Sequence, residues 1–354
     1  MPATLEQVKP ENIIPCKNGL LDITNLGGEL QLFNHTPRWF NLWCLDFPFD
    51  ENAKCDKWLA FLEDVFDGDR ERIALLQEFI DLCLTPDTSF QKILMLVGPK
   101  RSGKGTILRV ISELLGQDAV AAPTLTSLGE RFGLAQLHGK SVCMFPDAHL
   151  GRRADSMRVL ELLKSVSGED RVSIDRKHLP HLTNVRLKVR FIITVNELPR
   201  FTDASGALES RLLLLPFENS YAGREDRDLE GKLKAELPGI LNWALDGLYR
   251  LRTNGVFTEP SKSKTMVGNY RRLTAPITGF VEDCCDLGPE YSTKTSQLFA
   301  EWQRWCEANG HKAGSESTFG THLSAAYAGV RRRRVGQRGD RFYQYTGIGL
   351  AAVS

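Results

Sequence analysis

The chain has 354 residues, enough for two or three domains and a large hydrophobic core. Hydrophobic residues make up 42% and charged residues 25%, which is ordinary for a soluble globular protein, and the formal net charge of +1 excludes a polycation. No apolar run approaches the ~20 residues that span a bilayer, and the sequence start has no signal-peptide core, so we expect no membrane segment. The eight cysteines are scattered without a C-x-x-C pair, which predicts reduced thiols rather than a zinc site.

The first block, residues 1–87, is predicted to be a mostly helical domain that serves oligomerisation. It opens with two short strand-like pieces, GLLDI and LQLFN, and continues through an aromatic-rich segment into helical stretches. At this density, with apolar neighbours, aromatic residues indicate a core rather than a base-stacking surface. Three aromatic and two aliphatic residues recur at the spacing of one buried helical face: Trp58, Phe61, Leu62, Val65 and Phe66.

The most informative stretch is KILMLVGPKRSGKGTILRVISELLG at residues 92–116, in which an apolar strand leads through a glycine-rich loop into an amphipathic helix. Glycines allow successive N–H groups to point at phosphate, Lys104 supplies a cation, and the helix N-terminus adds its dipole. The residue after this lysine is usually Ser or Thr, but here it is Gly105, and the next hydroxyl belongs to Thr106. The predicted nucleotide-contacting residues are Gly98, Pro99, Lys100, Arg101, Ser102, Gly103, Lys104, Gly105 and Thr106.

Two polar residues follow later strands of this block. The apolar strand in KSVCMFPDAHL ends at Asp147, and the buried strand RFIITVN ends at Asn196. A carboxylate at the carboxyl end of a strand is where a nucleotide enzyme places the acid that organises Mg²⁺. Asp147 and the Thr106 hydroxyl are therefore the predicted metal ligands, and Asn196 is predicted to contact the γ-phosphate or its water. In another context the two would be a turn aspartate and a strand-end cap. Ala148 stands where a second acid usually polarises the attacking water, so the catalytic base stays open.

A basic hairpin and an arginine complete the second block, residues 88–221. Alternation in RVSID and VRLKVRF predicts the two strands of the hairpin, with RKHLPHLT near its tip. Farther on, Arg211 directly precedes a fourth buried strand, Leu212–Phe217. An arginine at that position is either a structural ion-pair partner or an arginine finger that projects into the nucleotide site of the neighbouring subunit.

Residues 222–275 are predicted to be a helical connector and residues 276–354 a winged-helix domain. After the helical segment TGFVEDCCDL, two helices (KTSQLFAEWQRWCEANG and ESTFGTHLSAAYAG) precede a strand, the turn GQRGD and a second strand, which is the winged-helix pattern. A run of arginines by itself indicates a solvated surface, whereas on a wing it favours phosphate binding. The run consists of Arg331, Arg332, Arg333 and Arg334.

The order of phosphate loop, strand-end acid, hairpin, TVNELP and SRLLLLPF resembles the superfamily 3 helicases of small DNA viruses, phages and plasmids. The closest likeness is to the primase-helicases of satellite phages, prophages and poxviruses, because LKSVSGEDRVSIDRKH is similar to their segment before the asparagine strand. The segment RKHL also resembles the hairpin tip with which polyomavirus-type helicases hold DNA. The resemblance covers most of the chain. It implies an α/β fold with a P-loop AAA+-like core, a mostly helical N-terminal domain and a C-terminal winged helix.

The same resemblance implies roles for individual residues. Lys104 would bind the β- and γ-phosphates of ATP, Asp147 would hold Mg²⁺, Asn196 would be the sensor, and Arg211 would act in trans as the finger. The implied DNA-binding residues are Lys177 and His178 at the hairpin tip, together with Arg331, Arg332, Arg333 and Arg334 on the wing.

The implied function is an ATP-dependent ring helicase, a homo-hexamer that translocates on single-stranded or forked DNA during phage, plasmid or mobile-element replication. A separate primase is an expected partner, a membrane is not, and the expected location is the cytoplasm of a bacterial host. One alternative, which Ala148 favours, is a replication initiator or helicase loader that uses ATP only as an assembly switch. Another is a signalling or defence NTPase whose winged helix mediates protein contacts, although the basic hairpin tip and the arginine wing argue against it.

Overall fold

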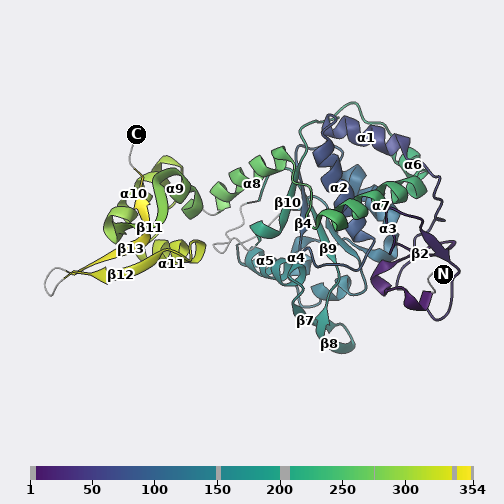
Figure 1. The fold of residues 1–354 in the computed structure, drawn as a ribbon, viewed down its shortest axis with the longest axis horizontal. Coiled ribbons are helices and arrows are strands. Elements are labelled where there is room, and N and C mark those ends of the chain that lie inside the picture. Colours follow the sequence, from purple (N-terminus) through teal and green to yellow (C-terminus); the bar gives the residue numbers. More distant parts are fainter. Residues whose placement is uncertain (1–4, 149–152, 200–207, 275, 337–340, 352–354) are drawn as a thin grey trace. The chain divides into compact units, whose positions relative to one another are not determined.

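The structure is a computed structural model that describes residues 5–148, 153–199, 208–274, 276–336 and 341–351. The chain divides into two compact units (Figure 1). The core unit comprises Met1–Pro199 and Arg211–Lys264, and the C-terminal unit comprises Thr265–Ser354 and Arg200–Ser210. Among the helices that the structure describes, none is long and apolar enough to cross a bilayer. The finer division of the chain at residues 87, 221 and 275 stays a prediction.

A parallel five-stranded sheet forms the centre of the core unit, in the order β10-β4-β9-β6-β5. Four of the strands are buried along their whole length, which is why they read as continuous apolar runs. Because the strands are parallel, residues that follow them share one end of the sheet, here called the carboxyl edge, and residues that precede them share the opposite amino edge. The strands are β4 (Ile93–Val97), β5 (Val120–Ala121), β6 (Val142–Phe145), β9 (Arg190–Val195) and β10 (Leu212–Pro216). The predicted α/β core is thereby confirmed.

The helices of the core unit pack around this sheet and on one another. Helix α2 contacts β10 and α7, α3 contacts α6 and α7, and α5 contacts β9. Close approach depends on small residues, since a Cβ on Gly239 of α7 would lie 2.2 Å from the backbone of Lys54. The helices are α1 (Asp56–Phe66), α2 (Arg70–Cys83), α3 (Lys104–Leu115), α4 (Leu125–Leu128), α5 (Arg153–Ser167), α6 (Leu229–Lys234) and α7 (Leu237–Asn254). Short 3₁₀ turns occur at Leu5–Gln7, Pro10–Asn12, Gln117–Ala119, Gly133–Leu137 and Glu209–Arg211.

A small antiparallel sheet, β1-β2-β3, precedes α1. The predicted apolar face of α1 is confirmed as core: Trp58, Leu62, Val65 and Phe66 are buried, and Phe61 packs against them. This cluster is continuous with residues of α2, α7 and the central sheet, so the N-terminal helices and the central sheet share one hydrophobic core. The strands are β1 (Ile13–Cys16), β2 (Gly19–Asp22) and β3 (Gln31–Phe33).

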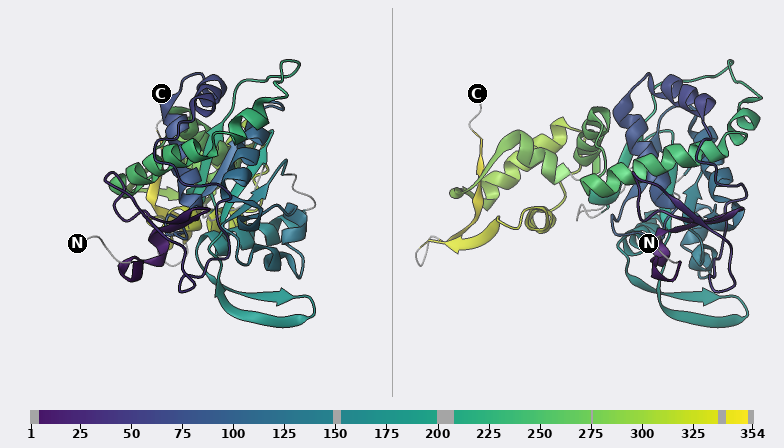
Figure 2. Two further views of the ribbon diagram at one scale, coloured as in Figure 1. Left: turned by 90° about the vertical axis from the view of Figure 1, so that its right-hand side faces the viewer. Right: turned by 45° about the vertical axis from the view of Figure 1, so that its right-hand side comes forward.

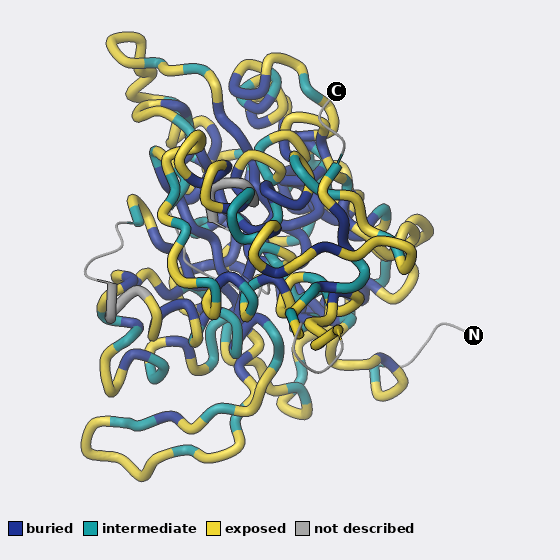
Figure 3. Tube along the Cα trace, turned by 90° about the vertical axis from the view of Figure 1, so that its left-hand side faces the viewer, coloured by how far each residue is buried: buried dark blue, intermediate teal, exposed yellow. Residues whose placement is uncertain are grey.

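An antiparallel hairpin of β7 (Arg171–Arg176) and β8 (Leu179–Arg186) projects from the core unit (Figures 1 and 2). Arg176 pairs with Leu179, so the turn consists of two residues, Lys177 and His178. The predicted hairpin is confirmed, but the prediction that VRLKVRF is its second strand is wrong, because β8 begins directly after the turn and the stretch before β9 is a connection. Both faces of β8 are largely exposed (Figure 3), so its sequence lacks the alternation of a half-buried strand.

The C-terminal unit has the predicted winged-helix order, with a three-stranded sheet β11-β13-β12. The prediction that the helix TGFVEDCCDL continues through Leu287 is wrong, because α9 ends at Cys284 and β11 begins at the next residue. Trp302 and Trp305 are buried in the hydrophobic core of this unit. The predicted turn GQRGD lies, apart from Gly336, outside the described residues. The elements are α8 (Ser261–Thr274, across the boundary between the units), α9 (Pro276–Cys284), β11 (Cys285–Lys294), α10 (Thr295–Ala308), α11 (Glu316–Ala326), β12 (Arg331–Val335) and β13 (Phe342–Leu350).

Candidate functional site

Residues 98–103, here called the phosphate loop, curl around the ammonium group of Lys104. This lysine is the first residue of α3, and its Nζ donates hydrogen bonds to the carbonyl oxygens of Gly98 at 2.6 Å and Pro99 at 2.7 Å. The residue is only 8% exposed. Burial lowers the pKa of the Lys104 ammonium, and the carboxylate of Asp147 acts in the opposite direction. The strand, loop and helix thus follow in the predicted order, with the cation held in the hollow of the loop.

Two glycines are required by the shape of this loop. A Cβ on Gly98 would lie 2.3 Å from the carbonyl oxygen of Phe217, the residue after β10. Gly103 has a φ of 93°, and a Cβ there would also lie 3.0 Å from Val65 of α1. Neighbouring segments therefore force glycine at both positions for steric reasons.

Residues 217–221, here called the strap, hold the phosphate loop from outside. The N–H groups of Phe217 and Tyr221 and the hydroxyl of Ser220 donate to carbonyl oxygens of Val97, Arg101 and Lys100, at 2.7, 2.8 and 2.9 Å respectively. The conformation of the phosphate loop, including the positive φ of 59° at Arg101, is thus fixed by a segment that lies more than a hundred residues away in the sequence.

Asp147 and Asn196 meet at the carboxyl edge, where Asn196 Nδ2 donates to Asp147 Oδ1 at 3.2 Å. Thr194 of β9 orders this turn, since it accepts from the N–H of Asp147 through Oγ1 at 2.8 Å and from the N–H of Ala148 through its carbonyl at 2.9 Å. These bonds hold Asp147 at a φ of 54°, a left-handed conformation that aspartate tolerates better than most residues. Sequence analysis missed Thr194, whose only signal is a lone hydroxyl in a buried apolar strand.

The side chains at this edge fit a Mg²⁺–nucleotide complex. In such sites the metal takes one or two protein oxygens in addition to phosphates and water. Asp147 is exposed, and the Thr106 hydroxyl lies in the first turn of α3, where it accepts from Arg109 at 3.3 Å. At Gly105 the nearest atom to an added Cβ would be Arg109 Nη1 at 3.4 Å, so no backbone contact requires glycine there. In the described part of the chain, no three His, Cys, Asp or Glu residues form a metal cluster.

Arg211 lies at the opposite edge of the sheet. It precedes β10, whose far end, Pro216, pairs with Val97 beside the phosphate loop. At ~3.3 Å per residue, this strand separates Arg211 from the loop by about 16 Å. Its guanidinium lies against Gly168, where an added Cβ would be 3.0 Å from Nη2. Within one chain, the structure therefore brings together Lys104, Asp147 and Asn196 but not Arg211.

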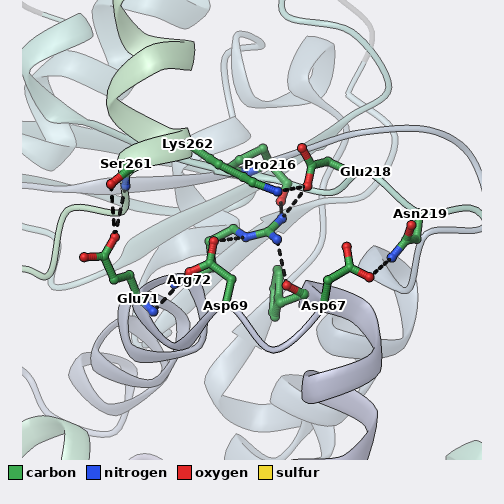
Figure 4. Close-up of polar contacts among 10 residues, drawn as sticks. Asp67, Asp69, Glu71, Arg72, Pro216, Glu218, Asn219, Ser261 and Lys262 are labelled. Atoms are coloured by element: carbon green, nitrogen blue, oxygen red, sulfur yellow. Dashed lines mark hydrogen bonds and ion pairs between the residues drawn. The ribbon is translucent and has the colours of Figure 1, made fainter.

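A buried arginine, Arg72, ties the corner between α1 and α2 to the segment that enters the strap (Figure 4). Its guanidinium donates to the Asp69 carboxylate at 2.8 Å, to the carbonyl of Pro216 at 3.0 Å and to a carbonyl at the end of α1 at 2.7 Å. It also pairs with Glu218 at 3.4 Å, and Glu218 pairs in turn with Lys262 of α8. The N-terminal helices thus help to hold the strap, and the strap holds the phosphate loop.

We expect Arg72→Ala to lower the free energy of unfolding by about 3 kcal/mol, because it removes a buried charge and leaves two carbonyl groups without their donor. Urea unfolding of the full chain measures the change. The matched control is Arg70→Ala on the same helix, where the side chain is 81% exposed and pairs with Glu63, so the loss should stay within about 0.5 kcal/mol. Equal losses in the two variants would contradict the role given to Arg72.

The hairpin tip presents the first group of predicted DNA-contacting residues. Lys177 and His178 are exposed at the turn, and His178 has a φ of 58°. Arg176 braces the turn from within, because its Nε and Nη2 both donate to the carbonyl of Pro180, at 3.0 and 2.8 Å. The two candidate residues therefore lie at the end of a projecting and internally braced element.

The wing presents the second group, Arg331–Arg334, which alternates between the two faces of β12. Arg332 and Arg334 lie over the ring of Tyr343, with Cζ at 4.3 and 5.9 Å from its centroid, and Arg332 also pairs with Glu316 at 3.2 Å. The other two arginines belong to the opposite face by strand alternation, and among the described residues neither forms an ion pair. All four are exposed.

Three family profiles match consecutive parts of the chain. Residues 2–67 match "D5 N terminal like", residues 96–211 match the family of unknown function DUF5906, and residues 275–352 match the RFX DNA-binding domain. The transcriptional regulator RFX1 of Candida albicans (strain SC5314) is 30% identical over 98 residues, which is 28% of this chain and 11% of that protein. The chain thus spans only about a tenth of this relative.

Solved structures of the NrS-1 C-terminal region have a similar fold. One apo structure is 15% identical with a TM-score of 0.55, covering 91% of this chain and 81% of that one. The A-form apo structure is 14% identical with a TM-score of 0.54, covering 97% of this chain and 84% of that one. At such identities the likeness is one of fold alone. The resemblance to the superfamily 3 primase-helicases of phages and plasmids is confirmed by the family profiles, for the chain joins D5-type and DUF5906 domains to an RFX-type winged-helix DNA-binding domain.

Proposed function

We propose that this protein is an ATP-dependent ring helicase that translocates on DNA during the replication of a phage, plasmid or mobile element. The observation that carries the proposal is the separation of the catalytic candidates. Lys104, Asp147 and Asn196 share the carboxyl edge of the sheet, whereas Arg211 lies at the amino edge. One subunit then holds an incomplete site, and the next subunit of a ring supplies the arginine. The homo-hexamer is the assembly that the resemblance implies.

In the proposed reaction, Lys104 exchanges its carbonyl partners in the phosphate loop for the β- and γ-phosphates of ATP. Asp147 and Thr106 would hold Mg²⁺, which neutralises phosphate charge when it is bound. Asn196, hydrogen-bonded to Asp147, orients the attacking water. The water oxygen forms the new bond to the γ-phosphorus as the bond to the β–γ bridging oxygen breaks, which gives ADP and phosphate and releases the proton of the water to solvent. A finger arginine is worth about 10³–10⁵ in rate in related chemistry, and this is the part assigned to Arg211 of the neighbouring subunit.

The hairpin couples this chemistry to DNA. Lys177 and His178 would contact phosphates of the strand, which gives sequence-independent and salt-sensitive binding. The hairpin leads through a short connection into β9, and Asn196 directly follows β9, so the proposed sensor and the DNA-contacting hairpin belong to one continuous segment. The RFX-type domain supplies a second DNA contact through the wing arginines. A separate primase is the partner that the resemblance implies.

A second candidate function is a replication initiator or loader that uses ATP as an assembly switch. Ala148 favours it, because the position that usually carries a water-polarising acid has no carboxylate. The two functions differ in turnover. ATP hydrolysis measured with and without single-stranded DNA, and strand displacement measured on a forked duplex, should show DNA-stimulated turnover and unwinding for the helicase. ATP-dependent assembly without unwinding would favour the switch instead.

We expect removal of charge at the hairpin tip and at the wing to affect different steps, DNA unwinding in the first case and initial DNA binding in the second. Lys177→Ala/His178→Ala should abolish unwinding but leave basal ATP hydrolysis and much duplex binding, because the hydrolysis site is intact while the hairpin no longer holds the DNA strand. Neutralising Arg331–Arg334 should weaken initial DNA binding, with a salt slope shallower by about 0.9 for each lost duplex contact, but spare unwinding at saturating DNA. Fork unwinding and binding titrations at several salt concentrations separate the two. Normal unwinding by the hairpin variant would rule out a translocating hairpin.

A further inference from the structure

A pocket of about 280 Å³ opens at the base of the hairpin. Its walls include Arg186 and Lys188, at the end of β8 and before β9, and Lys140 and Ser141, just before β6. These residues precede strands of the parallel sheet, so the pocket lies at the amino edge, whereas the phosphate loop lies at the carboxyl edge. The pocket is therefore separate from the candidate nucleotide site at the phosphate loop.

Basic side chains line the pocket, and no carboxylate does. Lys140, Arg186, Lys188 and His138 contribute to the lining, and no Asp or Glu does. Arg186 and Lys188 are exposed and alternate with the buried Leu187 and Val189, so both side chains point away from the core. Among the described residues, neither forms an ion pair. Lys140 Nζ donates to the carbonyl oxygens of Asp118 at 2.8 Å and Gln117 at 3.5 Å, which leaves one of its three donors for a ligand. Such a wall would attract an anion.

The N-terminal block contributes two apolar residues, Leu42 and Trp43, to the lining. Trp43 is partly buried against the core, and Leu42 beside it is 62% exposed. Leu42 lies over Gly139, where an added Cβ would be 3.2 Å from its side chain. An aromatic side chain and three permanent cations in the lining of one cavity suit a nucleotide, whose base can stack on a ring while its phosphate meets the cations.

We infer that this pocket holds one nucleotide of a single strand that runs along the hairpin, and the inference rests on the proposed function in taking the strand to be the translocated DNA. Residues 185–188 form both the pocket wall and the base of the hairpin whose other end carries Lys177 and His178. The eight residues of β8 span about 26 Å between the two places. The hairpin then contacts DNA at its tip and at its base, and the DNA strand enters or leaves the hairpin over Trp43.

Binding of a fluorescent oligo-dT to the full chain at several NaCl concentrations tests this site, and without ATP the result does not depend on hydrolysis. Arg186→Ala/Lys188→Ala should make the slope of log K against log salt shallower by about 1.4, because each single-strand contact contributes about 0.7. Lys54→Ala/Lys57→Ala, which removes the same charge from exposed positions at α1, should leave the slope unchanged. Trp43→Leu should weaken binding about tenfold, and Trp43→Phe should retain it, because the ring provides the stacking.

An unchanged salt slope in Arg186→Ala/Lys188→Ala would overturn the inference. Binding of dTMP as tight as that of the oligonucleotide would also overturn it, since the pocket would then serve a free nucleotide. Preference for polyglutamate over oligo-dT would assign the pocket to an acidic peptide and reject the strand. If the slope is unchanged while forks are still unwound, only the pocket is rejected. A shallower slope without any ATP turnover would instead keep the pocket and reject the helicase.

Discussion

Lys104→Ala should reduce ATP hydrolysis by about 10²–10³-fold or more, the loss seen when one preorganised donor to a developing negative charge is removed. The ammonium group is held in the hollow of the phosphate loop by the carbonyl oxygens of Gly98 and Pro99, so it is already positioned before a phosphate arrives. Steady-state turnover at saturating ATP measures the effect. Titration with a fluorescent ATP analogue shows whether binding is lost as well.

The control for this variant is Lys234→Ala, which removes the same charge from an exposed position on α6. Its turnover should match that of the unchanged protein. The fold of Lys104→Ala should persist, because the strap fixes the loop through backbone groups that the substitution leaves in place. Turnover near the unchanged level in a folded Lys104→Ala protein would contradict the assignment of the phosphate loop.

Much of the nucleotide-binding core could be predicted because its signals are local. The strand, glycine loop and helix around Lys104 are contiguous in sequence, and Asp147 and Asn196 each follow an apolar run that only a buried strand explains. Parallel topology then brings strand ends together without further information. The prediction that these two residues lie at one edge follows from that rule, and the hydrogen bond between them agrees with it.

The parts that sequence analysis missed depend on contacts between distant segments. The strap fixes the phosphate loop through backbone bonds, which leave no trace in residue type. Arg72 reads as one more charged residue of an amphipathic helix, although it is buried against carbonyl groups at the ends of α1 and β10. The start of β8 was missed for a different reason, because a strand exposed on both faces needs no alternation.

The pocket at the base of the hairpin could not be predicted from the sequence either. Trp43 belongs to an aromatic segment that reads as core, and Arg186 and Lys188 read as the outward face of a strand. Only the fold places these residues around one cavity. Sequence patterns thus locate residues that belong to one helix, strand or loop, whereas only the structure shows which residues from distant segments lie around one cavity.

Arg211→Ala should bind ATP with little change but hydrolyse it about 10³–10⁵-fold more slowly, if this arginine acts on the site of the next subunit. The reason is its place at the amino edge, one strand length away from the phosphate loop of its own chain. Arg211→Lys keeps the charge but loses the planar fork, so it should recover only part of the rate. The contact with Gly168 gives the alternative of a structural residue, for which loss of stability would accompany loss of rate.

Mixing separates these two explanations. Each variant alone should be inactive, because Arg211→Ala lacks the finger and Lys104→Ala lacks the lysine of the phosphate loop. Rings assembled from both variants contain interfaces of several kinds. Where an Arg211→Ala subunit contributes Lys104, Asp147 and Asn196, and its Lys104→Ala neighbour contributes the arginine, one interface is complete. With equal amounts and random order, about one interface in four should be restored in a ring built from a single repeated contact. ATP hydrolysis should therefore rise in the mixture above that of either protein alone. If mixed rings of confirmed composition stay inactive, Arg211 serves its own chain, because the arginine of a neighbouring subunit does not restore the activity of an Arg211→Ala subunit.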